Sequence, residues 1–177
     1  MKRSWSTDLF LKLNALQGVS HTLDILMFAC ANYLIYVLGF IVGIRALWLW
    51  VPDQFIILEY FILFIVIALA CSLGTSWWIG WMWPHRRPIV EHPRIKQMFR
   101  PMSTWKSFPS DHTIASFILV EAMILFSAPL WLSILLLGMA CAIGASRVYA
   151  GVHYPRDILG GVLFASGACL LAFVILF

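Results

Sequence analysis

Five long apolar runs alternate with short polar segments along this chain, and they limit the folds open to it. The runs cover residues 23–50, 55–83, 111–126, 130–145 and 155–177. A helix needs about 20 apolar residues to cross the hydrocarbon core of a bilayer. Only 11% of the residues are charged, whereas roughly a quarter are charged in a soluble domain. We therefore predict an all-α integral membrane protein, a bundle of about five or six transmembrane helices.

The N-terminal segment, residues 1–20, mixes polar and apolar residues. Between residues 5 and 19 the apolar positions recur at helical spacing, with Asp8 and Lys12 among them. These apolar positions are Leu9, Phe10, Leu13 and Leu16. We expect an amphipathic helix at the membrane interface and no cleaved signal peptide. The whole chain, residues 1–177, is expected to form a single membrane-embedded domain.

The first apolar run, residues 23–50, is longer than one span requires. It is therefore expected to hold a tilted helix, or a short helix followed by a span. A tight turn is predicted at residues 51–53, because a proline and an aspartate stand there between two apolar runs.

The net charge of +4 does not indicate nucleic-acid binding, because most basic residues flank apolar runs. Basic residues in such places meet lipid head groups or a phosphorylated substrate. The four cysteines lie inside apolar runs without metal-ligand spacing, so neither a metal site nor another cofactor is predicted. The expected partners are a phosphorylated lipid substrate and membrane lipids, and the sequence does not indicate an oligomeric state.

The segment from Ser146 to Asp157 carries a dense set of reactive side chains between two apolar runs. Proline fits the first turn of a helix, so a helix is expected to begin near Pro155. Asp157 then lies in the first turn, four residues after His153, where its carboxylate could reach a ring nitrogen of that histidine. A histidine oriented by a carboxylate suits an activated base or nucleophile. The simpler interpretation is that Asp157 only caps the helix.

The longest connection, residues 84–110, is the predicted active-site loop. It begins with a basic pair, Arg86 and Arg87, which could also be ordinary flanking charges of a span. At its end Ser110 is a good N-cap for the next helix, whose first amide groups would form an anion site. His112 is expected in the first turn of that helix. Here too an ordinary cap with an incidental histidine is the simpler interpretation.

Counting the spans places this loop and the Arg147 to Asp157 segment on one membrane face. Together the two segments describe a phosphate site, with arginines to bind phosphoryl oxygens and two histidines for nucleophile and acid roles. In the third run, Glu121 could handle protons, although a hydrogen-bonded role in helix packing is favoured.

These residues resemble the type 2 phosphatidic acid phosphatase (PAP2) superfamily, whose signature is shared with vanadium haloperoxidases and bacterial acid phosphatases. The third family motif is matched at Ser146, Arg147, His153 and Asp157. The second, Pro-Ser-Gly-His, is matched at Pro109, Ser110 and His112, with Asp111 in place of glycine. The match runs roughly from Arg87 to Asp157, under half of the chain.

The first family motif is incomplete. In the family this motif consists of a lysine, then six residues of any type, then Arg-Pro. Here Arg87 and Pro88 supply the Arg-Pro, but Gly80 stands at the position of the lysine. A phosphate-binding cation is therefore missing from its expected place. The candidates to replace it are Arg86, His85, Lys106 and Arg100.

The resemblance implies a mechanism. His153 would attack phosphorus and form a phosphohistidine, with Asp157 orienting it, while His112 would protonate the leaving oxygen and later activate water. Arg87, Ser110 and Arg147 would hold the phosphoryl oxygens, with Arg86 as a further candidate. The family mechanism requires no metal.

Asp111 and the small size resemble the bacterial subgroup that dephosphorylates undecaprenyl pyrophosphate, a lipid carrier recycled in peptidoglycan synthesis. A multi-pass protein of the bacterial inner (cytoplasmic) membrane with its active site on the outer face is therefore expected, although the positive-inside rule favours the opposite face. The alternatives are a phosphatase or phosphotransferase for phosphatidylglycerophosphate, phosphatidate or lipid A, and a non-hydrolytic protein that binds or transports phospholipids.

Overall fold

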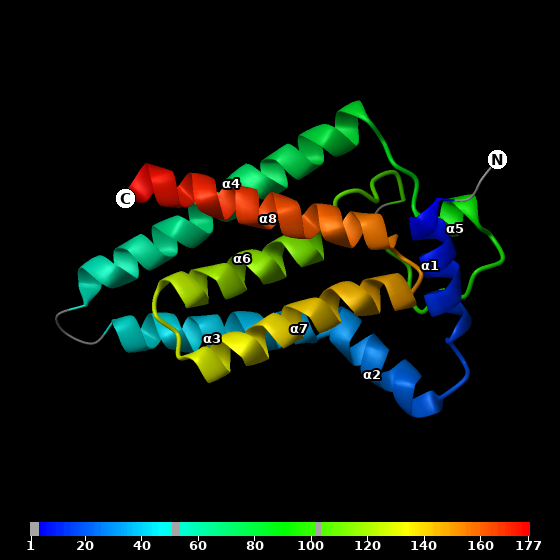
Figure 1. The fold of residues 1–177 in the computed structure, drawn as a ribbon, viewed down its shortest axis with the longest axis horizontal. Coiled ribbons are helices and arrows are strands. Elements are labelled where there is room, and N and C mark those ends of the chain that lie inside the picture. Colours follow the sequence, from blue (N-terminus) through cyan, green and yellow to red (C-terminus); the bar gives the residue numbers. More distant parts are fainter. Residues whose placement is uncertain (1–3, 51–53, 102–103) are drawn as a thin grey trace.

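Helices are the regular elements of this chain, and the predicted all-α fold class is confirmed. The computed structural model describes residues 4–50, 54–101 and 104–177, and no strand occurs within these ranges. The helices are α1 (Trp5–Ala15), α2 (His21–Asn32), α3 (Leu34–Leu49), α4 (Phe55–Met82), α5 (Pro88–Glu91), α6 (Asp111–Leu125), α7 (Leu130–Tyr149) and α8 (Pro155–Leu176). The longer helices share one long axis, and α1 lies across one end of the bundle (Figure 1).

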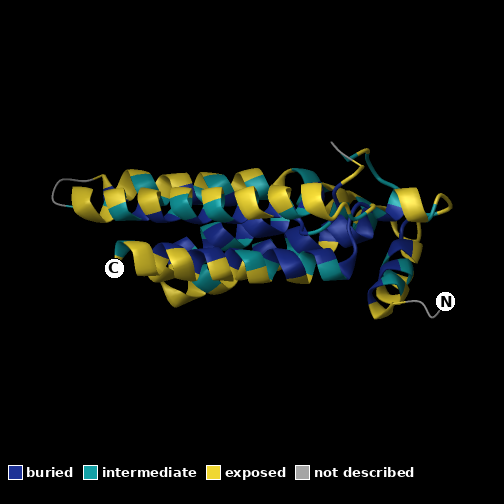
Figure 2. Cartoon of the chain, turned by 90° about the horizontal axis from the view of Figure 1, so that it is seen from above, coloured by how far each residue is buried: buried dark blue, intermediate teal, exposed yellow. Residues whose placement is uncertain are grey.

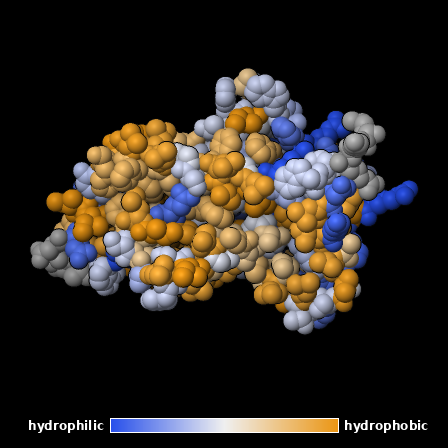
Figure 3. Space-filling model, in the orientation of Figure 1, coloured by the Kyte–Doolittle hydropathy of each residue, from blue (hydrophilic) through white to orange (hydrophobic). Residues whose placement is uncertain are grey.

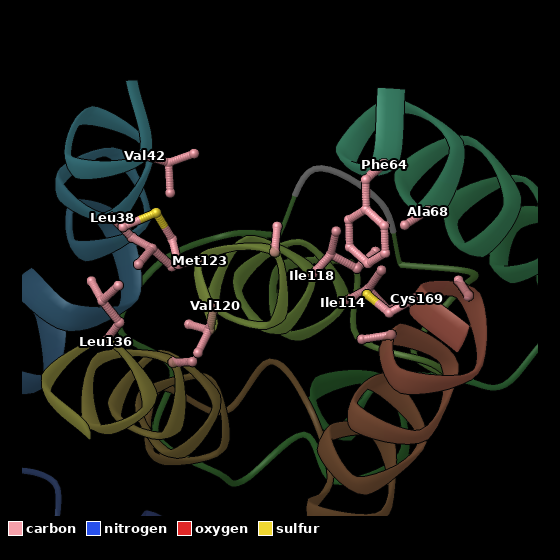
Figure 4. Close-up of a cluster of buried hydrophobic side chains, with 14 of the residues drawn as sticks. Leu38, Val42, Phe64, Ala68, Ile114, Ile118, Val120, Met123, Leu136 and Cys169 are labelled. Atoms are coloured by element: carbon pink, nitrogen blue, oxygen red, sulfur yellow. The ribbon is translucent and has the colours of Figure 1, made fainter. Parts of the chain in front are cut away.

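Helix α6 lies in the middle of the bundle and contacts α3, α4, α7 and α8. Its buried side chains point in several directions: Figure 4 shows Ile114 and Ile118 toward α4 and α8, and Val120 and Met123 toward α3 and α7. A helix that is apolar on all sides belongs in a core. Its 15 residues rise about 22 Å, less than the roughly 30 Å bilayer core. Its predicted role as a full span is therefore replaced by that of a short central helix.

The outer surface of the bundle is apolar. Large side chains such as Ile56 (71%) and Trp81 (77%) are exposed, and Figure 2 shows exposed positions on the outward helix faces. In Figure 3 hydrophobic atoms cover much of the bundle, while hydrophilic atoms gather at the end that carries α1. Three helices, α4, α7 and α8, are long and apolar enough to cross a membrane, and the α2–α3 pair would add a fourth. This pattern is that of a membrane protein.

The first apolar run forms two helices, α2 and α3, which meet at a bend of 49°. This agrees with the expectation of a short helix followed by a span. The tight turn predicted at residues 51–53 lies outside the described residues.

Helix α1 forms as predicted, but its buried face only partly matches the predicted apolar positions. Ser6, Phe10 and Asn14 are buried, whereas Leu9 and Leu16 remain exposed. The buried face packs on the loops at the end of the bundle: the Phe10 and Tyr154 rings are 5.3 Å apart. Polar contacts with those loops outweigh the hydrophobic pattern, because the loop backbone groups need partners once they are buried.

Candidate active site

Three segments that are far apart in the sequence meet at the α1 end of the bundle. They are the start of the loop after α4, the residues around the start of α6, and the connection from α7 to α8 (Figure 1). The prediction that both loops share one face is therefore confirmed. The meeting follows from helix direction, because α4 and α7 end where α6 and α8 begin.

Asp157 is completely buried in the first turn of α8. Its Oδ2 atom accepts hydrogen bonds from the Tyr154 amide (2.9 Å) and the Ser107 hydroxyl (2.5 Å). The same oxygen lies 3.5 Å from Nδ1 of His153. The carboxylate therefore caps the helix and also faces the histidine, so capping is not its only contact.

Arg87 contacts the other side of the His153 ring. Its Nη1 donates to the Val152 carbonyl at 3.0 Å and lies 3.1 Å from Nε2 of His153. A guanidinium has donors only, so Nε2 accepts and carries the lone pair. The proton of the neutral ring is then on Nδ1, which faces Asp157.

The buried setting of His153 favours the neutral ring. Burial lowers the pKa of His153 to about 4; Asp157 opposes this shift, and the positive charges of Arg87 and Arg147 add to it. At neutral pH the ring is uncharged, as a nucleophile requires.

Ser110 occupies the N-cap position of α6, as predicted, but its side chain does not cap the helix. Its hydroxyl accepts from Thr113 at 3.1 Å, and its amide donates to the Asp157 carbonyl at 3.1 Å. The first-turn amides of α6 have no acceptor within the helix and remain donors for an anion. His112 lies partly exposed in that turn.

Arg147 belongs to the last turn of α7, which extends beyond the predicted end at residue 145. Its Nη1 donates to the Ala31 carbonyl at 3.0 Å, next to the bend between α2 and α3. Its guanidinium also lies 5.1 Å from the centre of the Phe99 ring. Arg147 therefore brings positive charge to the site, while one of its N–H groups is bound to a backbone carbonyl. Arg86, by contrast, is exposed.

Two contacts at the site were given no role by the sequence. One is the Ser107 hydroxyl on Asp157. The other is the Tyr154 hydroxyl, which donates to Glu91 at 2.6 Å and joins the loop after α4 to the residue following His153. Burial, followed by this hydrogen bond, raises the pKa of Tyr154. Neither contact has a local sequence signal, because its partners are 50 and 63 residues apart.

Small residues on α8 let the loop and α6 approach closely. A Cβ atom at Gly160 would lie 2.3 Å from the Phe108 ring, and one at Gly161 would lie 2.8 Å from Cβ of Thr113. This close packing holds the segment from Phe108 to Thr113 against the start of α8.

Glu121 accepts a hydrogen bond from Ser166 of α8 at 2.6 Å, in agreement with the favoured packing role.

A groove of about 810 Å³ opens at the opposite end of the bundle, where its lining includes Arg45, Trp48 and Tyr60. None of the motif residues lines this groove. We place the site at the motif end because the histidines, the carboxylate and the arginines converge there. Among the described residues, no group of three or more His, Cys, Asp or Glu side chains is arranged to hold a metal ion.

Comparisons with known proteins identify the family. The PAP2 superfamily sequence profile matches residues 59–177. The chain is 42% identical over 130 residues to YbjG of Escherichia coli (strain K12), a candidate undecaprenyl-diphosphatase; this match covers 73% of the chain and 62% of YbjG. The chain thus spans less than two thirds of that relative.

Two further relatives are similar over most of the chain. The undecaprenyl-diphosphatase BcrC of Bacillus subtilis (strain 168) is 29% identical over 154 residues, which cover 85% of this chain and 75% of BcrC. The bacitracin transport permease protein BcrC of Bacillus licheniformis is 29% identical over 169 residues, covering 94% and 78%. The crystal structure of Aquifex aeolicus LpxE has a TM-score of 0.77 at 20% identity and covers 98% of this chain and 97% of LpxE. That likeness shows a shared fold.

Proposed function

This chain belongs to the PAP2 superfamily, and on that premise we propose that it is a membrane phosphatase acting on a lipid diphosphate. The proposed reaction converts undecaprenyl pyrophosphate to undecaprenyl phosphate and inorganic phosphate. The observation that carries this proposal is the placement of His153 between the Asp157 carboxylate and the Arg87 guanidinium. The undecaprenyl-diphosphatase relatives support the choice of substrate.

In the proposed first step, the Nε2 lone pair of His153 attacks the terminal phosphorus. The bond between this phosphorus and the bridging oxygen breaks, and its electron pair leaves with the lipid monophosphate. Burial lowers the pKa of His112 to about 4 in the free protein, and the negative charge of the bound diphosphate is proposed to raise it, so that His112 carries the proton that it gives to that oxygen. The Asp157 carboxylate stabilises the positive ring of His153. In the second step His112 takes a proton from water, whose oxygen attacks the phosphorus. The bond between phosphorus and Nε2 breaks, its electron pair returns to the His153 ring, and inorganic phosphate leaves.

The positive groups of the site suit the transition state of this reaction, in which negative charge spreads over the equatorial phosphoryl oxygens. Arg87, Arg147, Ser110 and the first-turn amides of α6 are proposed to bind these oxygens. Arg87 already contacts Nε2 of His153. The substrate must therefore draw the guanidinium toward its phosphate, which frees the lone pair for attack.

A groove between α4 and α8 is a suitable place for the start of the lipid tail. It encloses about 340 Å³ and is lined by Cys71, Ser72, Thr75, Leu163, Phe164, Gly167, Ala168 and Leu171. Phe164 in its wall contacts Phe108, whose ring centre lies 6.3 Å away and which precedes the Pro109-Ser110 motif. The groove thus adjoins the phosphate site, and the remaining tail would lie in the bilayer.

We place the protein in the bacterial cytoplasmic membrane with the site on the outer face. The support is the bacterial origin of relatives and the carrier-recycling reaction. The positive-inside rule uses the number of Lys and Arg residues to predict the cytoplasmic face. Because several basic residues at this end are assigned to phosphate binding, their number is a weaker guide to orientation here. Labelling of a cysteine introduced at exposed Arg94, in intact cells with an impermeant reagent, tests this face.

The first experiment measures phosphate release from undecaprenyl pyrophosphate in detergent with EDTA present. The intact protein is compared with His153→Ala, and with His21→Ala, which removes an exposed histidine. Release by the intact and His21→Ala proteins, but not by His153→Ala, is expected for a metal-independent phosphohistidine mechanism. Equal release by all three proteins would exclude His153 as the nucleophile.

Other lipids and other functions remain alternatives. Phosphatidylglycerophosphate, phosphatidate and lipid A are compared in the same assay, and an added alcohol acceptor detects phosphotransfer. A binding or transport function is favoured by one relative named as a transport permease. Retained binding of lipid diphosphate by folded protein without phosphate release would support that function.

A further inference from the structure

Lys106 lies in the active-site loop, yet only 4% of the residue is exposed. Its alkyl chain covers Gly80 of α4: a Cβ atom at position 80 would lie 2.8 Å from Cγ and 2.9 Å from Cδ of Lys106. Any side chain at position 80 would therefore push Lys106 from its place. The glycine and the buried lysine depend on each other sterically.

The ammonium of Lys106 is bound to Asp111 in the first turn of α6, at 2.5 Å. The same carboxylate oxygen accepts a hydrogen bond from Ser76 at 2.8 Å. Ser76 lies one turn before Gly80 on α4, and the neighbouring Trp77 ring centre is 5.6 Å from the ammonium. One face of α4 thus forms a socket for the lysine.

This socket adjoins the phosphate site. The next residue, Ser107, donates to Asp157, and Asp111 stands between Ser110 and His112. Electrostatics support this closeness. Burial lowers the pKa of Lys106, its pairing with Asp111 opposes the shift, and the charge of Arg87 lowers the pKa further. Burial also lowers the pKa of Arg87, and the charge of Asp111 opposes that shift.

We infer that Lys106 is a phosphate-binding residue of the proposed phosphatase, supplied by the loop where α4 has glycine at position 80. This inference rests on the proposed function. The Asp111 side chain is 38% exposed while that of Lys106 is buried. Asp111 can therefore take water as a partner when a phosphoryl oxygen takes the ammonium.

Two variants separate a role of Lys106 in phosphate binding from a purely structural role of its ion pair with Asp111. Lys106→Met keeps the length of the side chain and removes its charge. Asp111→Asn breaks the ion pair and keeps the ammonium. If Lys106 binds phosphate, Lys106→Met weakens binding of inorganic phosphate about 10- to 100-fold, the equivalent of one hydrogen bond to a charged group. Asp111→Asn leaves phosphate binding unchanged or tighter, because the ammonium loses its competitor.

The steric dependence gives a second test. Gly80→Ala should weaken phosphate binding in the intact protein, because it displaces Lys106. In a Lys106→Ala background the same change should have little further effect, because only the Trp105 ring, at 3.2 Å, then remains close to the new Cβ atom. Arg94→Met, which removes an exposed cation of the same loop, is the matched control.

The measurement is the dissociation constant of inorganic phosphate, by calorimetry on folded, detergent-solubilised protein, together with KM for the lipid diphosphate. The inference is overturned if Lys106→Met binds phosphate as the intact protein does, or if Lys106→Met and Asp111→Asn weaken it equally. Additive effects of Gly80→Ala and Lys106→Ala would also overturn it. If the intact protein binds phosphate but hydrolyses no lipid, the proposed function fails while the effect of Lys106 on binding still decides the inference.

Discussion

Nε2 of His153 lies 3.1 Å from Nη1 of Arg87, so one guanidinium contacts the atom that is proposed to attack phosphorus. The contact fixes the ring tautomer, with the remaining proton on the side of Asp157. It also blocks the lone pair until a phosphate draws the arginine away. In the proposed mechanism Arg87 therefore covers Nε2 of His153 before the substrate binds and then binds the phosphoryl group.

Arg87→Ala is expected to lower kcat/KM for lipid diphosphate by about 100- to 1,000-fold, as for the loss of one preorganised donor to a developing oxyanion. Arg87→Lys should recover little of this activity, because an ammonium lacks the planar pair of donors. Arg86→Ala removes the exposed neighbour and should change kcat/KM less than about tenfold. Equal effects of Arg86→Ala and Arg87→Ala would contradict the assignment.

Ser107→Ala removes the hydroxyl that donates to Asp157 and is expected to lower kcat about tenfold, the value of one hydrogen bond to a charged group. KM should stay within about twofold, because Ser107 positions the carboxylate rather than the substrate. Steady-state kinetics give both values. Ser133→Ala, at the opposite end of the bundle, is the control. A rise in KM with unchanged kcat in Ser107→Ala would argue against a positioning role.

Gly160→Ala is expected to inactivate the enzyme by displacing the Phe108 ring, which a Cβ atom would approach to 2.3 Å. Overpacking of this kind costs about 1 to 3 kcal/mol in the free energy of unfolding. Gly138→Ala, on α7 and outside the proposed lipid groove, has nothing within 4 Å of its new Cβ atom. That variant should keep its activity. Phosphate release and thermal unfolding in detergent test the pair, and similar behaviour of both variants would show that the close packing is unimportant.

The free energy of unfolding should fall as the pH drops from 6.5 toward 4, because the pKa of buried His153 is about 4 instead of 6.5. In this window the unfolded chain binds a proton at this residue and the folded protein does not, so acid favours unfolding. At pH 4.5 the loss attributable to His153 is about 2 to 3 kcal/mol.

His153→Gln should therefore lose less stability than the intact protein between pH 7 and pH 4.5. His21→Gln, which changes an exposed histidine, should follow the intact protein. Denaturant unfolding in detergent at the two pH values makes the comparison. Parallel losses in the intact and His153→Gln proteins would mean that His153 is readily protonated in the folded state.

Much of this architecture follows from local sequence. The apolar runs predicted the all-α membrane fold, because a segment in lipid must satisfy its backbone hydrogen bonds within a helix. The number of runs set the helix directions, and these bring Arg87 and His153 to one end. The spacing of His153, Pro155 and Asp157 predicted their contact, because all three lie within one turn of a helix start.

Other features depended on contacts between distant segments. The buried face of α1 only partly follows its hydrophobic pattern, because Ser6 and Asn14 are buried where they bind backbone groups of distant loops. The sequence showed that Gly80 leaves the motif without a lysine and offered four replacements, but it could not choose among them. Only the folded structure brings the alkyl chain of Lys106 over Gly80 and its ammonium to Asp111. Our inference that Lys106 is the replacement rests on packing between residues 26 positions apart, which no local periodicity encodes.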